Sequence, residues 1–300
     1  MIDPWRIRMT NLAQPTYLEF PLKTWWAERT DWVEKALDEC FPEDAEYLGN
    51  VGEMMRYCLF SGGKRFRPIL SFGAAECLGK SGRIAMAAAC AYEMIHCFSL
   101  AHDDLPCMDD DDLRRGKPTA HKMFGEAGAL LAGDGLSIWA FHKISELPEG
   151  VPPEVGLQLV QDLAVASGHP GMVGGQVIDM AAQQGSVTQE MLEAVHRAKT
   201  GALITGAVRA GAMLAGATAD QLEKFTEYGR AVGLVFQLTD DILDADEDPD
   251  GVSFVSLLGI DETKRLVKES TQIALDSLSE FGRAADPLRA LAVFLEDRKG

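Results

Sequence analysis

Apolar residues recur at three- and four-residue spacing along almost the whole chain, which places them on one face of an α-helix. No stretch alternates apolar and polar residues for long enough to indicate a strand. The pattern therefore predicts an all-α protein. The predicted helices span residues 24–39, 49–60, 66–78, 84–102, 130–147, 153–166, 171–183, 191–214, 219–245, 261–281 and 287–297.

Short turn signals separate these helices, and none is long enough to be an interdomain linker. They are Ser81-Gly82, the proline- and glycine-rich stretch 148–153, and Gly185-Ser186. Repeats and low-complexity segments are absent from the sequence. We therefore predict one helical domain over residues 24–300. Residues 1–23 form a tail or leader before it, and residues 1–9 are either native or an added leader.

The charge balance narrows the choice of partners. The chain has 46 acidic and 28 basic residues, a net charge of −18, which disfavours binding to nucleic acid or to anionic lipid. We expect no nucleic-acid partner. An anionic substrate would have to be bound by a local cluster of Lys and Arg, or by divalent cations that bridge carboxylates to the ligand.

The cysteines and the most apolar segment suggest a soluble cytoplasmic protein. The six cysteines form no CxxC pair and mostly lie in apolar helical pattern, as expected of buried thiols in a reducing compartment. The segment from Ile84 to Leu100 is interrupted by Glu93 and His96, so we expect a core helix and no membrane span. No signal peptide is apparent at the start of the chain.

Two acidic clusters carry candidate metal chemistry. Residues 103–112 contain six carboxylates, and Asp240, Asp241 and Asp244 follow one another in a helical pattern that places Asp240 and Asp244 on one face. Like charges at this spacing destabilise a helix, and a cation between them removes the penalty. Mg²⁺ takes oxygen ligands and often bridges carboxylates to phosphates. The two clusters together favour a shared metal site over two unrelated solvated faces.

Basic residues gather in two turns that could hold an anion. Residues 62–68 read Gly-Gly-Lys-Arg-Phe-Arg-Pro before a helix, and residues 113–118 follow the first acidic cluster. Glycines let backbone approach a ligand closely, and Lys with Arg at a helix start can hold phosphate. The alternative is that these residues only neutralise neighbouring acids on the surface. The stretch 196–201, which contains Lys199, is a weaker candidate.

Five segments in this order resemble the short-chain trans-isoprenyl diphosphate synthases, the farnesyl and geranylgeranyl diphosphate synthase family. They are GGKRFRP (62–68), FSLAHDDLPCMDDDDLRRGKPTAH (98–121), MVGGQVID (172–179), HRAKTGAL (196–203) and FQLTDDILD (236–244). The resemblance runs from about Thr24 to the C-terminus. It implies an all-α bundle with a central active-site cavity, normally a homodimer. It also implies Mg²⁺-dependent joining of an allylic diphosphate to isopentenyl diphosphate by ionisation, condensation and elimination.

The resemblance also implies roles for particular residues. Three Mg²⁺ ions would be held by Asp103, Asp104 and Asp109 with Asp240, Asp241 and Asp244. Metal-free isopentenyl diphosphate would be bound by Gly63, Lys64, Arg67, His96 and Arg115. Arg114 and Lys199 would bind the allylic diphosphate, and the oxygens of Thr200 and Gln237 would face the allylic cation. The residues expected to carry the chemistry are thus Asp103, Lys199, Thr200, Gln237 and Asp240.

In the family that the chain resembles, product length is set by the size of the side chains just before the first Asp motif. Phe98 lies five positions before Asp103 and Ser99 lies four before it. An aromatic ring at Phe98 resembles the bacterial farnesyl type, so we expect farnesyl diphosphate. The sequences DDLPCMD and DLRRGKPT also resemble those of plant geranylgeranyl diphosphate synthases, so this product stays open as an alternative. Phe98 as simple core filler, and a non-catalytic synthase-like subunit, stay open as further alternatives.

One segment departs from the family pattern. After Asp244 the family usually continues through a loop with a Gly-Lys and ends in a second Lys, whereas here residues 248–251 run almost directly into residues 252–259. Both lysines are missing. The preferred hypothesis is that the sequence omits a segment of a mobile lid. The alternative is that the protein has lost a loop and a cation.

Overall fold

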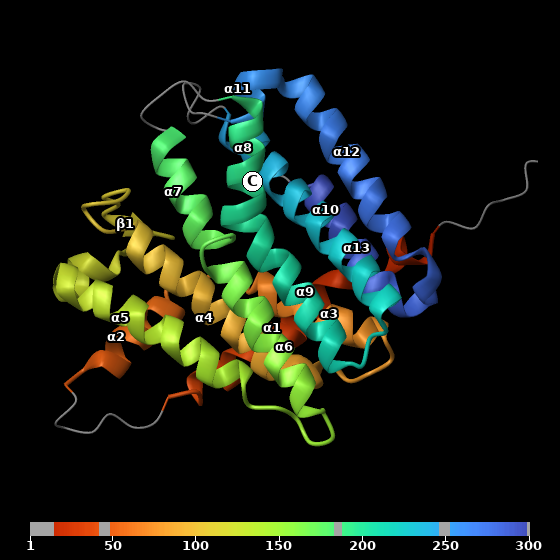
Figure 1. Cartoon of the computed structure of the whole chain (residues 1–300). Coiled ribbons are helices and arrows are strands. Elements are labelled where there is room, and N and C mark those ends of the chain that lie inside the picture. Colours follow the sequence, from red (N-terminus) through yellow and green to blue (C-terminus); the bar gives the residue numbers. More distant parts are fainter. Residues whose placement is uncertain (1–14, 42–48, 183–187, 246–252, 299–300) are drawn as a thin grey trace, which may run out of the picture.

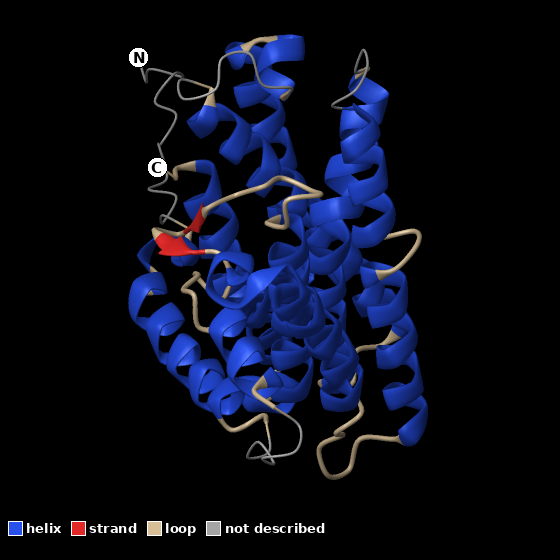
Figure 2. Cartoon of the chain, turned by 90° about the vertical axis from the view of Figure 1, so that its left-hand side faces the viewer, coloured by secondary structure: helices blue, strands red, loops and turns tan. Residues whose placement is uncertain are grey.

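The structure is a computed structural model that describes residues 15–41, 49–182, 188–245 and 253–298. Nearly every element in these ranges is a helix, which confirms the all-α prediction (Figure 2). The α-helices are α1 (Leu22–Asp38), α2 (Val51–Leu59), α3 (Phe66–Cys77), α4 (Met86–Asp103), α5 (Ala120–Ile144), α6 (Pro153–Ser167), α7 (Met172–Ala182), α8 (Gln189–Val195), α9 (Ala202–Leu214), α10 (Ala219–Asp244), α11 (Phe254–Leu258), α12 (Ile260–Ser277) and α13 (Asp286–Glu296). The two strands are β1 (Leu113–Arg114) and β2 (Lys117–Pro118).

Helices α3, α4, α9 and α10 form the interior on which the other helices pack (Figure 1). Helix α9 contacts α3, α4 and α10, and α4 also packs along α5. The apolar side chains form two large buried clusters, one between α4 and α5 and the other around α10 and α13. Burial of these apolar side chains supplies the main driving force for folding. Small residues make the close packing possible, and Ala87 to Ala91 of α4 are buried.

Three predicted helices differ from the structure in instructive ways. The helix predicted at 130–147 begins at Ala120, because α5 continues across a kink at Gly125, where φ is +78° and the apolar period is broken. The helix predicted at 191–214 consists of α8, a π-helical turn at His196–Gly201 and α9. The N-terminal turn of the helix predicted at 84–102 is a 3₁₀ turn at Gly82–Ala85.

Two short elements were not predicted. Residues 113–118 form an antiparallel hairpin in which Leu113 pairs with Pro118 and Arg114 with Lys117. Strands of two residues are too short for an alternating pattern to be visible. Helix α11 has only five residues, and it lies directly after residues 246–252, which are outside the described part of the chain.

One helical segment, Gly82–Asp103, is long and apolar enough by length and composition to cross a membrane. Most of its apolar window, 61%, is buried inside the protein. That burial fits the core helix expected from the sequence.

Candidate active site

The first acidic cluster begins at the C-terminal end of α4. Asp103 is the last residue of this helix, and its carboxylate has no hydrogen bond or ion pair within the described ranges. It lines a cavity of about 390 Å³ together with Lys199 and Thr200. Burial raises the pKa of Asp103 to about 6, with Asp109 acting in the same direction and Lys199 opposing it. A partly buried carboxylate that is costly to ionise is a good ligand for a cation.

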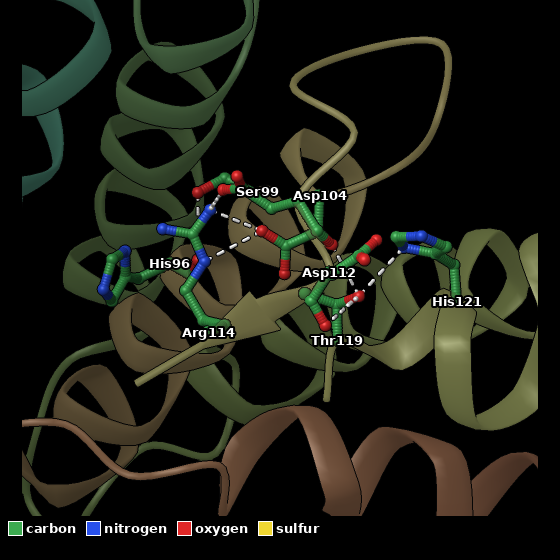
Figure 3. A network of polar contacts seen from close by, with 8 residues as sticks. His96, Ser99, Asp104, Asp112, Arg114, Thr119 and His121 are labelled. Atoms are coloured by element: carbon green, nitrogen blue, oxygen red, sulfur yellow. Dashed lines mark hydrogen bonds and ion pairs between the residues drawn. The ribbon is translucent and has the colours of Figure 1, made fainter. Parts of the chain in front are cut away.

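Asp104 and Arg114 are bound to each other instead of facing this cavity (Figure 3). The Arg114 guanidinium donates from Nε to Asp104 Oδ1 over 2.8 Å and from Nη2 to Asp111 Oδ2 over 2.8 Å. Asp104 is buried, with 3% of its surface exposed. Burial raises its pKa, and Arg114 counteracts that rise. The pair ties hairpin β1–β2 to the end of α4 and so positions the acidic loop.

Thr119 closes the other side of the same loop (Figure 3). Its hydroxyl donates to the Asp111 carbonyl over 2.8 Å and lies 3.1 Å from His121 Nδ1. Since Thr119 has only one proton to donate, Nδ1 of His121 acts as the donor to Thr119. These contacts fix residues 111–121 against the start of α5.

The second acidic cluster lies at the end of α10 and is held by partners that the sequence did not indicate. The Asp240 carboxylate forms an ion pair with the Arg298 guanidinium at 2.6 Å. The Asp241 carboxylate accepts a hydrogen bond from the Phe254 backbone N–H at 2.7 Å. Burial raises the pKa of Asp240, which Arg298 partly offsets, and raises the pKa of Asp241 to about 6. Asp244 is exposed at the last turn of the helix. Arg298 is distant in sequence, so no motif spacing pointed to it.

A second cavity, of about 500 Å³, is lined by cationic side chains. It contains the predicted Gly63, Lys64, Arg67, His96 and Arg115, together with Arg298. Gly63 has φ of +130°, and a Cβ at this position would lie 2.5 Å from Nη1 of Arg115. The glycine therefore lets the Arg115 side chain fold over the loop, where it donates to the Gly62 carbonyl.

Arg65 and Arg67 differ in their partners. Arg65 is buried and ion-paired with Glu93 at 3.0 Å and with Glu34, so it holds the loop in the core. Arg67 is 8% exposed, and its Nε has no hydrogen-bond partner. Burial lowers the pKa of Arg67. Among the described residues no carboxylate forms an ion pair with Arg67, and a bound anion would satisfy this guanidinium.

His96 lies between the two cavities. Burial and the charges of Arg67 and Arg115 hold the pKa of His96 well below its usual range, so the imidazole is neutral at pH 7. Arg67 and His96 line both the cationic cavity and the cavity at Asp103. The two cavities therefore adjoin at these side chains.

The π-helical turn at His196–Gly201 presents Lys199 and Thr200 to the cavity at Asp103. Lys199 Nζ pairs with Asp179 on α7 at 2.6 Å. Gly175, also on α7, packs so tightly that a Cβ there would lie 2.3 Å from the Lys199 backbone N. π-Helical turns are rare and frequently occur at functional sites.

Two side chains of the MVGGQVID segment belong to the site without having been singled out. Asp179 is the partner of Lys199, and Gln176 lines the cavity with both amide atoms buried and without a hydrogen-bond partner. Their i, i+3 spacing on a helix was the available indication. The predicted Gln237 is half-buried on α10, one turn before Asp240.

Comparison with known proteins agrees with this arrangement. Residues 49–253 match the family model described as Polyprenyl synthetase. The chain belongs to the polyprenyl synthetase family. This confirms the resemblance found in the sequence and makes the chain a member of a prenyltransferase family.

Relatives of this polyprenyl synthetase include enzymes of two product types. A geranylgeranyl pyrophosphate synthase from Catharanthus roseus is 42% identical over 93% of this chain and 82% of its own length. A farnesyl diphosphate synthase from Geobacillus stearothermophilus is 48% identical over 72% of this chain and 73% of its own length. The solved structure of a FPP/GFPP synthase from Zymomonas mobilis superposes with a TM-score of 0.87 at 38% identity, covering 93% of this chain and 99% of that one.

The donor groups of this polyprenyl synthetase suit Mg²⁺ without forming a complete ligand set. In the described part of the chain, no three His, Cys, Asp or Glu side chains lie close enough together to hold one ion. Asp103 and Asp241 are nevertheless carboxylates whose burial raises their pKa, and cations would relieve that cost. Oxygen donors of this kind are what Mg²⁺ binds.

The apolar part of the cavity at Asp103 is formed by α4 and α7. Phe98 and Ser99 line it from α4, opposite Val173, Val177 and Met180 of α7. Ser99 donates its hydroxyl to the His96 carbonyl over 2.9 Å and so presents little polarity to the cavity. These side chains form an apolar wall beside Asp103.

Proposed function

We propose that this protein is a Mg²⁺-dependent prenyltransferase that joins isopentenyl diphosphate to dimethylallyl and geranyl diphosphate and releases farnesyl diphosphate. One observation carries the proposal. A cationic cavity adjoins the mainly apolar cavity at Asp103, and the two meet at Arg67 and His96. Two diphosphates that react with each other need two such sites, and the cationic lining of one and the carboxylate and apolar wall of the other assign one substrate to each.

The cavity at Asp103, with the two acidic clusters, binds the allylic diphosphate. Asp103, Asp104 and Asp109 from one side and Asp240, Asp241 and Asp244 from the other would hold Mg²⁺, expected as three ions. When bound, Mg²⁺ would stabilise the negative charge that develops on the leaving diphosphate. Lys199 adds a positive charge on the same side of the cavity. The pairs Arg114–Asp104 and Arg298–Asp240 position the two acidic segments.

Cleavage of the allylic C–O bond leaves an allylic cation in the apolar part of the cavity. Thr200 lines that cavity, and its oxygen, with that of Gln237, would face the cation. Preorganised dipoles of this kind stabilise developing charge at little reorganisation cost. The wall of Phe98 and Met180 excludes water that would otherwise capture the cation.

The cationic cavity binds isopentenyl diphosphate. Lys64, Arg67 and Arg115 neutralise its diphosphate, and the Gly63 backbone allows close approach. Its double bond would then lie at the boundary formed by Arg67 and His96. The terminal alkene carbon, C4, forms a new C–C bond with the allylic cation and leaves a tertiary cation at C3, and loss of a proton from C2 then forms the C2=C3 double bond. We assign the released diphosphate as the base.

Phe98 supports a farnesyl product because its ring lines the cavity about one helical turn from Asp103. Geranylgeranyl diphosphate is the second candidate product. It is favoured by the 42% identity to geranylgeranyl pyrophosphate synthases from Catharanthus roseus and Capsicum annuum, which extends over more of the chain than the farnesyl match.

The test is incubation of the purified protein with Mg²⁺, isopentenyl diphosphate and, separately, the C5, C10 and C15 allylic diphosphates, followed by mass spectrometry of the products. Accumulation of C15 from the C5 and C10 starters, with the C15 starter left unextended, would support the proposal. A C20 product would replace farnesyl by geranylgeranyl diphosphate. No product from any starter would contradict the proposal and indicate a non-catalytic subunit.

The proposed enzyme acts as a homodimer in the cytoplasm. Apolar side chains on adjoining helices α5 and α6 are exposed, including Leu131 at 57%, Ile138 at 69% and Leu157 at 63%. Such a patch suits the face of a second copy. All six cysteines are free thiols, as a reducing compartment would keep them. Light scattering during size-exclusion chromatography should give twice the monomer mass, and Ile138→Glu should reduce it to the monomer.

A further inference from the structure

The ring of Phe98 is not held by apolar packing alone. The imidazole of His102, one turn further along α4, meets it edge to face, with ring centroids 4.9 Å apart and planes at 82°. Edge-to-face contacts of this kind restrict the rotation of both rings. Both side chains line the cavity at Asp103. The position of the Phe98 ring therefore depends on that of the His102 ring.

His102 is in turn fixed to the neighbouring helix. Its Nε2 lies 3.0 Å from the Leu130 carbonyl oxygen of α5, and because a carbonyl can only accept, Nε2 carries the proton. The Asp134 carboxylate lies 4.0 Å from the same nitrogen. The ring is thus held at one edge by α5 while its other side packs on Phe98.

A glycine on α5 makes room for this ring. A Cβ at Gly133 would lie 2.2 Å from His102 Nε2 and 2.4 Å from Cδ2, distances at which the imidazole would have to move. A helix interior normally disfavours glycine relative to alanine. The side chain that benefits from the space is His102, so Gly133, His102 and Phe98 form one connected set across α5 and α4.

We propose that His102, seated on Gly133, is the positioning residue that holds Phe98 in place as the end of the product cavity and thereby sets product length. The inference rests on the proposed prenyl-transfer function. His102 directly precedes Asp103, so the same helical turn carries both the acid of the reaction site and the support of the cavity end. Displacing the imidazole would free the Phe98 ring to rotate and open space for a longer chain.

The experiment compares the ratio of C20 to C15 products for His102→Ala, Gly133→Ala and Phe98→Ala in full-length protein. We expect each single variant to raise this ratio at least several-fold. His102→Ala should have no further effect when combined with Phe98→Ala, because both act through one ring. His102→Gln, whose amide can still donate to Leu130, should restore part of the wild-type ratio.

A matched control is available on the same helix. A Cβ at Gly135 would meet the Met55 sulfur at 2.8 Å and not His102, so Gly135→Ala should leave the ratio unchanged even if it lowers the melting temperature. The proposal is overturned if folded, active His102→Ala keeps the wild-type ratio, or if its effect is undiminished in the Phe98→Ala background. Wild-type product length is read in the same assay. A wild type that makes C20 would refute the farnesyl assignment. The His102 proposal would still be tested, because it requires that His102→Ala make longer products than the wild type does.

Discussion

The two adjoining cavities differ in the charges that they offer to a bound diphosphate. In the cationic cavity the protein supplies the countercharge itself, through Lys64, Arg67 and Arg115. The cavity at Asp103 has one carboxylate at its edge, and burial raises the pKa of Asp103, and of Asp241 in the second acidic cluster, to about 6. Under the proposed function, a diphosphate would enter the first cavity alone, whereas it would need cations to bind at the second.

The difference assigns different chemical tasks to the two cavities. A diphosphate held by fixed Arg and Lys side chains is anchored, and nothing about the cavity favours its departure. A diphosphate held through metal ions becomes a better leaving group, because the developing charge is neutralised. In the proposed function, this arrangement would separate the substrate that ionises from the substrate that attacks.

The largest expected effect comes from the two acidic clusters. Asp103→Asn and Asp240→Asn should each lower kcat by about 10³-fold with little change in the melting temperature, because each removes a charge needed to hold metal at the leaving group. Asp112→Asn provides the control, since Asp112 is exposed and pairs with Lys122 at 2.6 Å on the surface. Steady-state kinetics with saturating Mg²⁺ would measure these effects. Near wild-type turnover in Asp103→Asn would refute the metal assignment.

A different kinetic signature is expected from the cationic cavity. Arg115→Ala should raise KM for isopentenyl diphosphate by about 10- to 100-fold, the loss of one or two charge-assisted hydrogen bonds, and leave the Mg²⁺ dependence unchanged. Arg230→Ala is the matched control, because Arg230 is exposed and its nearest acid, Glu223, is 3.9 Å away. If KM for the allylic substrate rose instead, the assignment of substrates to cavities would be reversed.

The pH dependence should also separate the cavities. Asp103 and Asp241 have pKa values of about 6 in the metal-free protein, so they are protonated at pH 5 and ionised at pH 7. Because metal binding releases these protons, Mg²⁺ affinity should fall by up to about tenfold per pH unit below pH 6. Isothermal titration of Mg²⁺ into metal-free protein would measure it.

His96 should contribute no pH dependence near neutrality. Burial and the charges of Arg67 and Arg115 hold its pKa well below the usual range, so the imidazole is neutral at pH 7. The ratio of KM for isopentenyl diphosphate between His96→Gln and wild type should therefore be constant from pH 7 to pH 8. A ratio that changes over this range would show that His96 titrates there.

The smallest expected effect tests the contact between the cavities. Arg298 lines the cationic cavity and also pairs with Asp240 at 2.6 Å. Arg298→Ala should raise KM for isopentenyl diphosphate and weaken Mg²⁺ binding together, each by about three- to tenfold, because one guanidinium serves both sites. Arg283→Ala, an exposed arginine near the C-terminal end, serves as control. A change in only one of the two parameters would separate the cavities completely.

Helices and motifs were predictable from the sequence because they rest on local patterns. The apolar period located most helices within a few residues, and the order of the basic and acidic segments indicated the polyprenyl synthetase family. The cationic set of Gly63, Lys64, Arg67, His96 and Arg115 does come together in one cavity. These residues either lie within one turn or follow motifs of fixed spacing.

The remaining features depend on tertiary contacts. The π-helical turn at Lys199 packs against Gly175, and the kink at Gly125 hides the start of α5, so neither follows from the apolar period. The pairing of Asp104 with Arg114 depends on a hairpin with strands of only two residues, which no periodic pattern indicates. Arg298 meets Asp240 only because α13 packs on α10.

The most direct test of the two-cavity account is equilibrium binding of each substrate with Mg²⁺ and with EDTA, using a non-ionisable thio analogue of geranyl diphosphate to prevent turnover. The account predicts that the geranyl analogue binds only with Mg²⁺. It predicts that isopentenyl diphosphate binds in EDTA, and that Arg115→Ala weakens this metal-free binding by about 10- to 100-fold. Tight binding of the geranyl analogue in EDTA, or a strict Mg²⁺ requirement for isopentenyl diphosphate, would contradict it.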